Sequence, residues 1–402
     1  MELDTPFVTP RRDAKVIGLV STGHFFSHFY MLLLPPLFPV LRDIYGVGYT
    51  ELGFAITVFS LTTGLTQAPV GFLVDRYGAR TLLIAGVLLE SLAFALIGVF
   101  PVYGMLLGLM VLAGIANAVY HPADYAILNA AVDPKRMGRA FSIHTFAGFV
   151  GEALAPVTMI VLMTVVDWQA GLIACGCAGI AVAIVMALNS EVLNDAHIAR
   201  SNPEARQNSA TGMRLLFSAP ILMGLLFFVG LSIAGRGVNG FSVATLHTLY
   251  DTPLTEASAV LAAFLFASPI GVLAGGWIAD RVSRHDVVAA GCFIVVACVI
   301  FSIAAFELSL VTIAVLFAIA GFLSGVVAPS RDMLIRAVTP PGQVGKVFGF
   351  VSTGFNIGGI IGPVLFGYIL DNANPRLVFW TVGIVSLLTI ATVLETGRRG
   401  RN

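Results

Sequence analysis

The sequence has few charged residues and no excess charge of either sign. Charged side chains make up 11% of the 402 residues, and 22 Lys and Arg balance 22 Asp and Glu. Globular chains average roughly 25% charged residues, so a soluble fold is excluded. A nucleic acid needs a basic face that neutralises its phosphates, so no nucleic-acid partner is expected.

Three other features are missing. The four cysteines lie inside apolar runs, without the spacing of a disulfide scaffold or a zinc site, so we interpret them as small apolar side chains. There is no Gly-x4-Gly-Lys-Ser/Thr loop that would cradle nucleotide phosphates, and no Gly-x-Ser-x-Gly nucleophile turn. We therefore expect neither ATP-driven transport by this chain nor an enzyme activity.

Apolar side chains are abundant instead, at 57% of the residues and a mean hydropathy of +0.93. At ~20 residues per bilayer-spanning helix, this content would fill about a dozen spans. Charge clusters and turn residues divide the chain into apolar segments that are each long enough to cross a bilayer. There are twelve: 16–41, 52–74, 81–100, 102–132, 141–166, 170–188, 220–250, 257–279, 287–306, 309–338, 347–370 and 377–394.

The first segment follows Arg11, Arg12 and Lys15. It is too long for the apolar region of a signal peptide, about 7–15 residues, and no small-residue cleavage pattern follows it, so we expect a retained helix. Cations in short loops stay on the cytoplasmic side of a membrane. With the N-terminus inside, eighteen of the 22 Lys and Arg fall on that side, Arg42 and Arg376 fall outside, and Arg236 and Arg331 lie within spans. The pattern predicts that both termini are cytoplasmic.

The polar interval from 189 to 212 divides the chain into two halves that repeat. Pro122 and Pro156 recur as Pro329 and Pro363, each 207 residues further along. Two six-helix repeats are typical of transporters, which place their site at the repeat interface. The predicted organisation is a cytoplasmic tail (1–15), a first six-helix bundle (16–190), a cytoplasmic linker (191–213), a second bundle (214–395) and a tail (396–402).

The segment 71–80, Gly-Phe-Leu-Val-Asp-Arg-Tyr-Gly-Ala-Arg, resembles the loop between the second and third helices of the major facilitator superfamily. A degenerate copy at 276–284 lies in the equivalent loop of the second half, with Ser283 in place of the second glycine. The resemblance implies an all-α membrane protein of twelve transmembrane helices in two pseudo-symmetric bundles. A gating role is implied for the motif residues Gly71, Asp75, Arg76, Gly78, Arg80, Asp280 and Arg281.

Within that superfamily, the segments 30–39, 57–63 with 67–69, and 120–122 resemble exporters of the fosmidomycin-resistance type, related to drug/proton antiporters. Helix five departs from the antiporter pattern, because Ala155-Pro156 stands where many of them carry Gly-Pro. The resemblance implies a functional monomer in a bacterial inner membrane, a small-molecule substrate, protons as partners and a proton gradient in place of a cofactor.

Charged and polar residues inside spans are costly and usually line a transport path. His24 and His28 lie one turn apart on the first helix, and Asn117, His121 and Asp124 form a stripe on the fourth, where Pro122 breaks the backbone ladder. Helix five carries His144 and Glu152 eight residues apart. The proton-exchanging groups we predict are Asp124, Glu152, His28 and His121. For Glu152, and for Glu90 in helix three, the alternative is a structural ion pair.

The second half offers arginines instead: Arg236 in a glycine-flanked stretch, and Arg331, the repeat counterpart of Asp124. Guanidinium groups bind carboxylate or phosphonate bidentately, so the two could hold an anion, or else pair within the protein. The predicted substrate-binding residues are His24, His28, Tyr30, Asn117, His121, Asp124, Arg236, Asn239 and Arg331.

These residues predict a secondary active transporter that exports a small polar, anionic or amphiphilic compound by alternating access, driven by protons. Two alternatives stay open within the same fold: proton-coupled import of a small organic anion, and divalent-metal transport through His24, His28, His121 and Asp124. No resident metal is expected in the leading interpretation. A sensor without transport activity is the remaining alternative.

Overall fold

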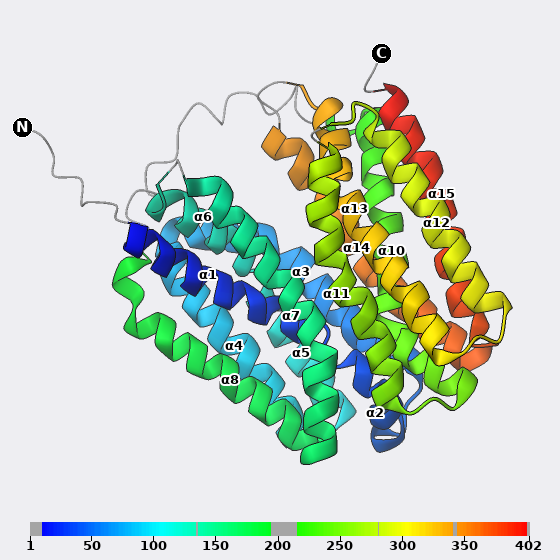
Figure 1. Ribbon diagram of the computed structural model, residues 1–402. Coiled ribbons are helices and arrows are strands. Elements are labelled where there is room, and N and C mark those ends of the chain that lie inside the picture. The colour runs from blue at the N-terminus through cyan, green and yellow to red at the C-terminus, as the bar shows by residue number, and fades with distance from the viewer. Residues whose placement is uncertain (1–9, 134–135, 194–214, 280, 341–343, 400–402) are drawn as a thin grey trace, which may run out of the picture. The chain divides into compact units, whose positions relative to one another are not determined.

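A computed structural model describes residues 10–133, 136–193, 215–279, 281–340 and 344–399, apart from the side chains of Ala68, Asp75, Gly138 and 344–346. Helices dominate this part of the chain and no strand occurs in it (Figure 1). Each of the twelve predicted segments is helical. The predicted linker lies, from residue 194 on, outside the described residues.

The chain forms two compact units. The first comprises residues up to Met31, Thr62–Ala155 and Leu162–Asn202. Its helices are α1 (Pro10–Met31), α4 (Ala79–Val99), α5 (Tyr103–Asn117), α6 (Tyr120–Ala131), α8 (Trp168–Leu188) and the short η3 (Ser190–Val192), with most of α3 (Tyr49–Tyr77) and of α7 (Met137–Val165). Helix α4 packs along α8 and α5 (Figure 1). Apolar side chains such as Val20, Val87 and Ile127 form its core.

The second unit comprises Leu32–Leu61, Pro156–Val161 and the residues from Pro203 on. Its helices are η1 (Pro35–Leu37), α2 (Phe38–Tyr45), α10 (Ala219–Tyr250), α11 (Leu254–Ala279), α12 (His285–Ala305), α13 (Leu310–Ala337), α14 (Val344–Asn372) and α15 (Arg376–Arg399). Helices α11 and α13 pack together, as do α10 and α14. Phe227, Phe293 and Val351 belong to its core.

Local sequence explains where several helices begin and end. The Asp167 carboxylate accepts a hydrogen bond from the Ala170 N–H at 2.6 Å and so caps the N-terminus of α8. Gly46, at φ 62°, ends α2, and Gly78, at φ 89°, separates α3 from α4. Both positions favour glycine because L side chains rarely adopt such φ values.

Eleven helical runs in the described residues are long and apolar enough to cross a membrane, judged by length and composition. Helix α3, with 29 residues, is not among these runs, because the side chains of Ala68 and Asp75 within it are not described. Multiple crossing is therefore supported. Twelve crossings, and cytoplasmic termini, stay predictions.

Two predicted single helices are broken. The first segment divides into α1, η1 and α2 around Pro35-Pro36, and the fourth divides into α5 and α6 at residues 118–119. The second break confirms the expectation for Pro122, which lacks the N–H that would continue the ladder. Pro329, its repeat counterpart, lies inside the unbroken α13.

An ion pair holds the N-terminal end of α1. Asp13, 1% exposed, accepts hydrogen bonds from the Arg136 Nε at 2.7 Å and from the Asp133 N–H at 3.2 Å. These bonds fix α1 against the connection between α6 and α7. The same three helices carry the polar cluster described next.

Candidate functional site

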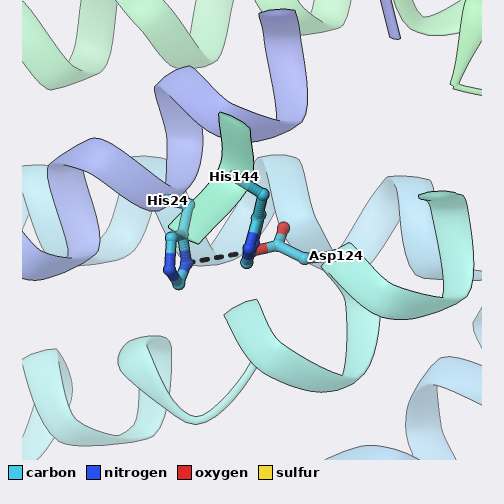
Figure 2. A group of neighbouring side chains, drawn as sticks. All are labelled: His24, Asp124 and His144. Atoms are coloured by element: carbon cyan, nitrogen blue, oxygen red, sulfur yellow. Dashed lines mark hydrogen bonds and ion pairs between the residues drawn. The ribbon is translucent and has the colours of Figure 1, made fainter. Parts of the chain in front are cut away.

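Asp124 lies in the first turns of α6, just after the break that separates it from α5. Its side chain is fully buried. Its Oδ2 lies 2.9 Å from Nε2 of His144 on α7 and 3.3 Å from Nδ1 of His24 on α1. Figure 2 shows the three side chains converging from three helices. A buried carboxylate is thus surrounded by imidazoles rather than by a Lys or Arg.

A second carboxylate and histidine pair links α1 with α7. Nδ1 of His28 lies 2.8 Å from Oε1 of Glu152, and the two side chains are 25% and 22% exposed. This pair is more accessible than the Asp124 cluster. The partner of Glu152 is therefore a histidine, and not the arginine that a structural ion pair was expected to supply.

The imidazole rings form one group. The His24 ring is stacked on His144, with 3.7 Å between centroids and 22° between planes. Its centroid lies 4.6 Å from that of His28 and 5.3 Å from that of His121. His24 and His144 are buried, whereas His121 is exposed and lies beside Tyr125. The cluster of His24, His28, His121, His144, Asp124 and Glu152 is called the histidine–carboxylate cluster below.

Two glycines of α7 make room for this cluster. A Cβ on Gly151 would lie 2.3 Å from the Phe25 carbonyl oxygen, so the two backbones approach closely only because no side chain intervenes. A Cβ on Gly148 would lie 3.0 Å from Nε2 of His24 and 3.1 Å from Cδ2 of His28. The missing side chain at Gly148 thus provides the space for both rings.

Two of the predicted substrate-binding residues, Asn117 and Tyr30, make contacts outside the histidine–carboxylate cluster. The Asn117 amide donates to Glu90 Oε1 at 3.1 Å, so Asn117 pairs with a fully buried carboxylate of α4. Tyr30, 1% exposed, donates to the Cys175 carbonyl at 3.0 Å and stacks on Phe94. These contacts tie α1 to α8 and α5 to α4.

In the second unit, Arg331 lies 2.8 Å from Asp332 through its Nε. Its guanidinium also lies over the rings of Phe228 and Phe355, 5.0 and 5.4 Å from their centroids. This pairing within the protein is one of the two arrangements expected for Arg331.

Arg236 lies on α10 beside α14. The position of a Cβ on Gly359 would be 3.4 Å from its Nη2 and 3.0 Å from the Ser60 Oγ. Asn239, one turn further along α10, has a buried Oδ1 that accepts no hydrogen bond within the described residues. The glycines of α14 therefore allow this helix to pack closely against the Arg236 side chain.

The loop motif is described in part. Gly78 supplies the positive φ, and Arg80 donates to the Ser190 carbonyl at 3.4 Å. Arg76 lies over Tyr77, and Arg281 over Trp277 at 4.0 Å. A Cβ on Gly71 would meet nothing within 4 Å. The side chain of Asp75, and Asp280 as a whole, lie outside the described residues.

His144 is the residue that the predicted site omits. Its eight-residue spacing from Glu152 places both on one face of a helix, and this spacing was the available signal. Its contact with Asp124 depends on how α7 packs on α6, which the sequence does not display.

The whole chain can now be compared with known proteins. The family model described as Major Facilitator Superfamily matches residues 20–243 and 225–401. The chain belongs to the major facilitator superfamily. It is therefore an integral, multi-pass membrane protein of a transporter family, and not an enzyme.

Individual relatives agree with this assignment. The chain is 24% identical over 406 residues to the fosmidomycin resistance protein of Escherichia coli (strain K12), which spans 98% of this chain and 95% of that protein. It is 27% identical over 252 residues to a probable L-galactonate transporter of the same strain, over 60% of this chain and 55% of that protein. The expected resemblance to the fosmidomycin-resistance type is confirmed.

A solved structure shares the fold. It is the crystal structure of a bacterial homolog to the human lysosomal transporter Spinster, in an inward-facing and unoccupied conformation, with a TM-score of 0.80. The match covers 97% of this chain and 98% of that chain at 14% identity. At this identity the likeness shows the fold alone.

Proposed function

We propose that this protein is a proton-coupled secondary transporter that exports a small polar, anionic or amphiphilic compound by alternating access. The observation behind the proposal is the histidine–carboxylate cluster, buried among helices long enough to span a membrane. Ionisable groups inside a membrane protein are costly and mark ion and substrate pathways. Imidazole and carboxylate side chains both take up and release protons, so the cluster offers groups that could carry the coupled protons.

The arrangement supports proton exchange at two sites of different accessibility. The His28–Glu152 pair is about a quarter exposed and can meet a proton from an aqueous path. Asp124, with no exposed side-chain surface, lies deeper and is reached through the stacked rings of His24 and His144. Because His24 is close to both His28 and His144, the rings connect the two carboxylates into one relay.

The substrate class follows from the second unit and from the relatives. Arg236 and Arg331 offer guanidinium groups that suit carboxylate or phosphonate. The relatives include a fosmidomycin resistance protein and a probable L-galactonate transporter, and the latter name describes an anionic substrate. Small organic anions are therefore the first compounds to test. Twelve crossings with cytoplasmic termini complete the proposed topology, with α3 as the twelfth span.

Proton movement in proteoliposomes tests the proposal. Purified protein is reconstituted with a pH-sensitive dye inside, and phosphonates, organic acids and lipophilic cations are added in turn. We expect at least one compound to drive a proton flux that disappears in Asp124→Asn and persists in Asp43→Asn, whose side chain is 70% exposed. Silence of the folded wild-type protein across the panel, or equal flux in Asp124→Asn, would refute the proposal.

Import of a small organic anion by proton symport is the second arrangement of the same parts. The two directions differ in the sign of the flux. An outward substrate gradient drives protons inward in an exporter that exchanges substrate for protons, and outward in a symporter. Recording that sign with oriented proteoliposomes decides between them.

A further inference from the structure

Three of the most buried groups of the histidine–carboxylate cluster meet at one point. His24, Asp124 and His144 each offer one ligand atom, and these atoms all lie within 4.8 Å of one another. They come from α1, α6 and α7, as Figure 2 shows. This set differs from the metal ligands expected from sequence: His144 replaces His28, which faces Glu152 instead.

The three side chains at this point are buried, and some of their polar atoms have no hydrogen-bond partner. The side chains of His24, Asp124 and His144 are 5%, 0% and 1% exposed. Among the described residues, Nδ1 of His24, one of the atoms at the meeting point, has no hydrogen-bond partner. Nδ1 of His144 and Oδ1 of Asp124 have none either, although these are not the atoms that take part in the shared contact. Buried polar atoms are nearly always satisfied in native proteins, and each exception asks for an explanation such as a missing ion.

The distances suit one small ion. Zinc-like ions bind imidazole nitrogen and carboxylate oxygen at ~2.0–2.1 Å, so two ligand atoms of a tetrahedral ion lie about 3.3 Å apart. Nδ1 of His24 lies 3.3 Å from Asp124 Oδ2, and Nε2 of His144 lies 2.9 Å from the same oxygen. An ion would require the second contact to open by a few tenths of an ångström. It would also require the stacked rings of His24 and His144, which lie 22° apart, to tilt so that both nitrogens face it.

The types of ligand atom limit which metal ions the site would bind. Imidazole with carboxylate suits Zn²⁺, Co²⁺, Ni²⁺ and similar transition metals, whereas Mg²⁺ and Ca²⁺ prefer all-oxygen sites. Two nitrogens and one oxygen leave a position for a fourth ligand. His121 is the neighbouring group that suits this position, since its ring lies 5.3 Å from His24 and is exposed.

We propose that His24, Asp124 and His144 bind a divalent transition-metal ion of the Zn²⁺ class, with His121 or water as the fourth ligand. The site goes beyond the proposed proton coupling. A bound dication requires neutral imidazoles and an ionised carboxylate, so metal and protons compete for the same atoms. The metal is consequently an alternative occupant of the proton site, and it blocks coupled transport while it is bound.

Co²⁺ is the probe, because it absorbs visible light when bound in a low-coordinate nitrogen and oxygen site. Full-length protein, purified in detergent with chelator and then freed of it, is titrated with Co²⁺ and followed by absorbance and by equilibrium dialysis. We expect about one Co²⁺ per chain, displaced by Zn²⁺ and not by Mg²⁺. His144→Gln should weaken binding by more than the ~10–100-fold that loss of an outer-shell partner costs.

His247→Gln is the matched control, because His247 lies in the second unit and bonds to the Thr252 carbonyl. This variant should bind Co²⁺ as the wild type does. Absence of bound Co²⁺ in folded wild-type protein, verified by circular dichroism, overturns the inference. Equal binding by His144→Gln and His247→Gln overturns it as well, because the ion would then lie elsewhere.

The proposed function is tested separately. Proton flux measured with chelator present needs no metal, so its presence together with failed Co²⁺ binding removes only the metal site. Conversely, Co²⁺ binding without any proton flux retains the site and removes the proton coupling.

Discussion

Asp124 and Arg331 occupy equivalent positions of the two repeats, 207 residues apart, and each lies two residues after a proline. Asp124 is buried between two imidazoles. Arg331 pairs with Asp332 and lies over two phenylalanine rings. The neighbours of these two residues differ as well. Gly148, which makes room for the histidine rings, has Phe355 as its counterpart in the second repeat, and the ring of Phe355 contacts Arg331.

The other cluster positions show the same contrast. At the repeat counterparts of His121, His144 and Glu152 stand Ala328, Val351 and Gly359. One half thus carries imidazole and carboxylate groups, whereas the other carries arginine, apolar side chains and glycine. The two halves of a duplicated helical scaffold therefore carry different chemical groups at equivalent positions, and the proposed function assigns proton exchange to the first unit and anion binding to the second.

Placing the second-half residue in the first half should have the largest effect. Asp124→Arg buries a guanidinium against His24 and His144 without a counter-charge, and an unpaired buried charge costs about 3–5 kcal/mol. We expect a large fall in the thermal unfolding temperature in detergent and no proton flux. Glu307→Arg, at a side chain that is 86% exposed, should leave both unchanged. A stable and active Asp124→Arg protein would show that the site of Asp124 accepts the arginine of the second repeat, so the difference between the two halves would carry no function.

Removing the more accessible carboxylate should uncouple transport with a moderate loss of stability. Glu152→Gln keeps the size of the side chain but removes the charge that faces His28, and hydrogen bonds to charged groups contribute about 1.5–3 kcal/mol. Proton flux is measured as a function of pH, with Glu307→Gln as the control. An unchanged pH profile would leave Glu152 a structural residue.

Adding a single methyl group at Gly148 of α7 should disturb the histidine rings packed against it. Gly148→Ala places a Cβ 3.0 Å from the His24 ring, which must shift by a few tenths of an ångström, and overpacking costs about 1–3 kcal/mol. We expect weaker proton coupling and slightly lower stability. Gly108→Ala, where a Cβ meets nothing within 4 Å, is the control. Full activity of Gly148→Ala would show that the rings have room to spare.

The smallest effect is expected in the second half. Arg331→Lys keeps the charge and loses the bidentate fork, so an anionic substrate should bind about tenfold more weakly, or ~1.4 kcal/mol. Proton coupling per substrate should not change. Substrate affinity is measured by transport at varied concentration, with Arg284→Lys as the control. Normal affinity would mean that Arg331 serves only its contacts with Asp332 and the phenylalanine rings.

The sequence predicts where the helices lie, because the thickness of a bilayer sets the length of each apolar segment and charged residues mark the loops between segments. It also predicts that His24 and His28 lie one turn apart on a helix face. The predicted stripe of Asn117, His121 and Asp124 is not kept, because the break at 118–119 places Asn117 on α5, where it pairs with Glu90. Pro122 breaks its helix as predicted, while Pro329 at the counterpart position does not. A proline at a given repeat position therefore does not by itself predict a break.

Contacts between helices are harder to predict. His28 meets Glu152 because Gly148 and Gly151 allow α7 to approach α1 closely. His144 meets Asp124 because α7 also packs on α6. Glycine spacing indicates that two helices can approach, but it does not say which partner they choose. The pairing of cluster members therefore came only from the structure.

The central claim is that the first unit couples protons and the second does not. The most direct test compares two rates in the same proteoliposomes, substrate exchange without a pH gradient and transport driven by one. For Asp124→Asn we predict that exchange persists while gradient-driven transport is lost, and for Arg331→Lys that both fall together. Loss of gradient drive in Arg331→Lys with intact coupling in Asp124→Asn would contradict the account.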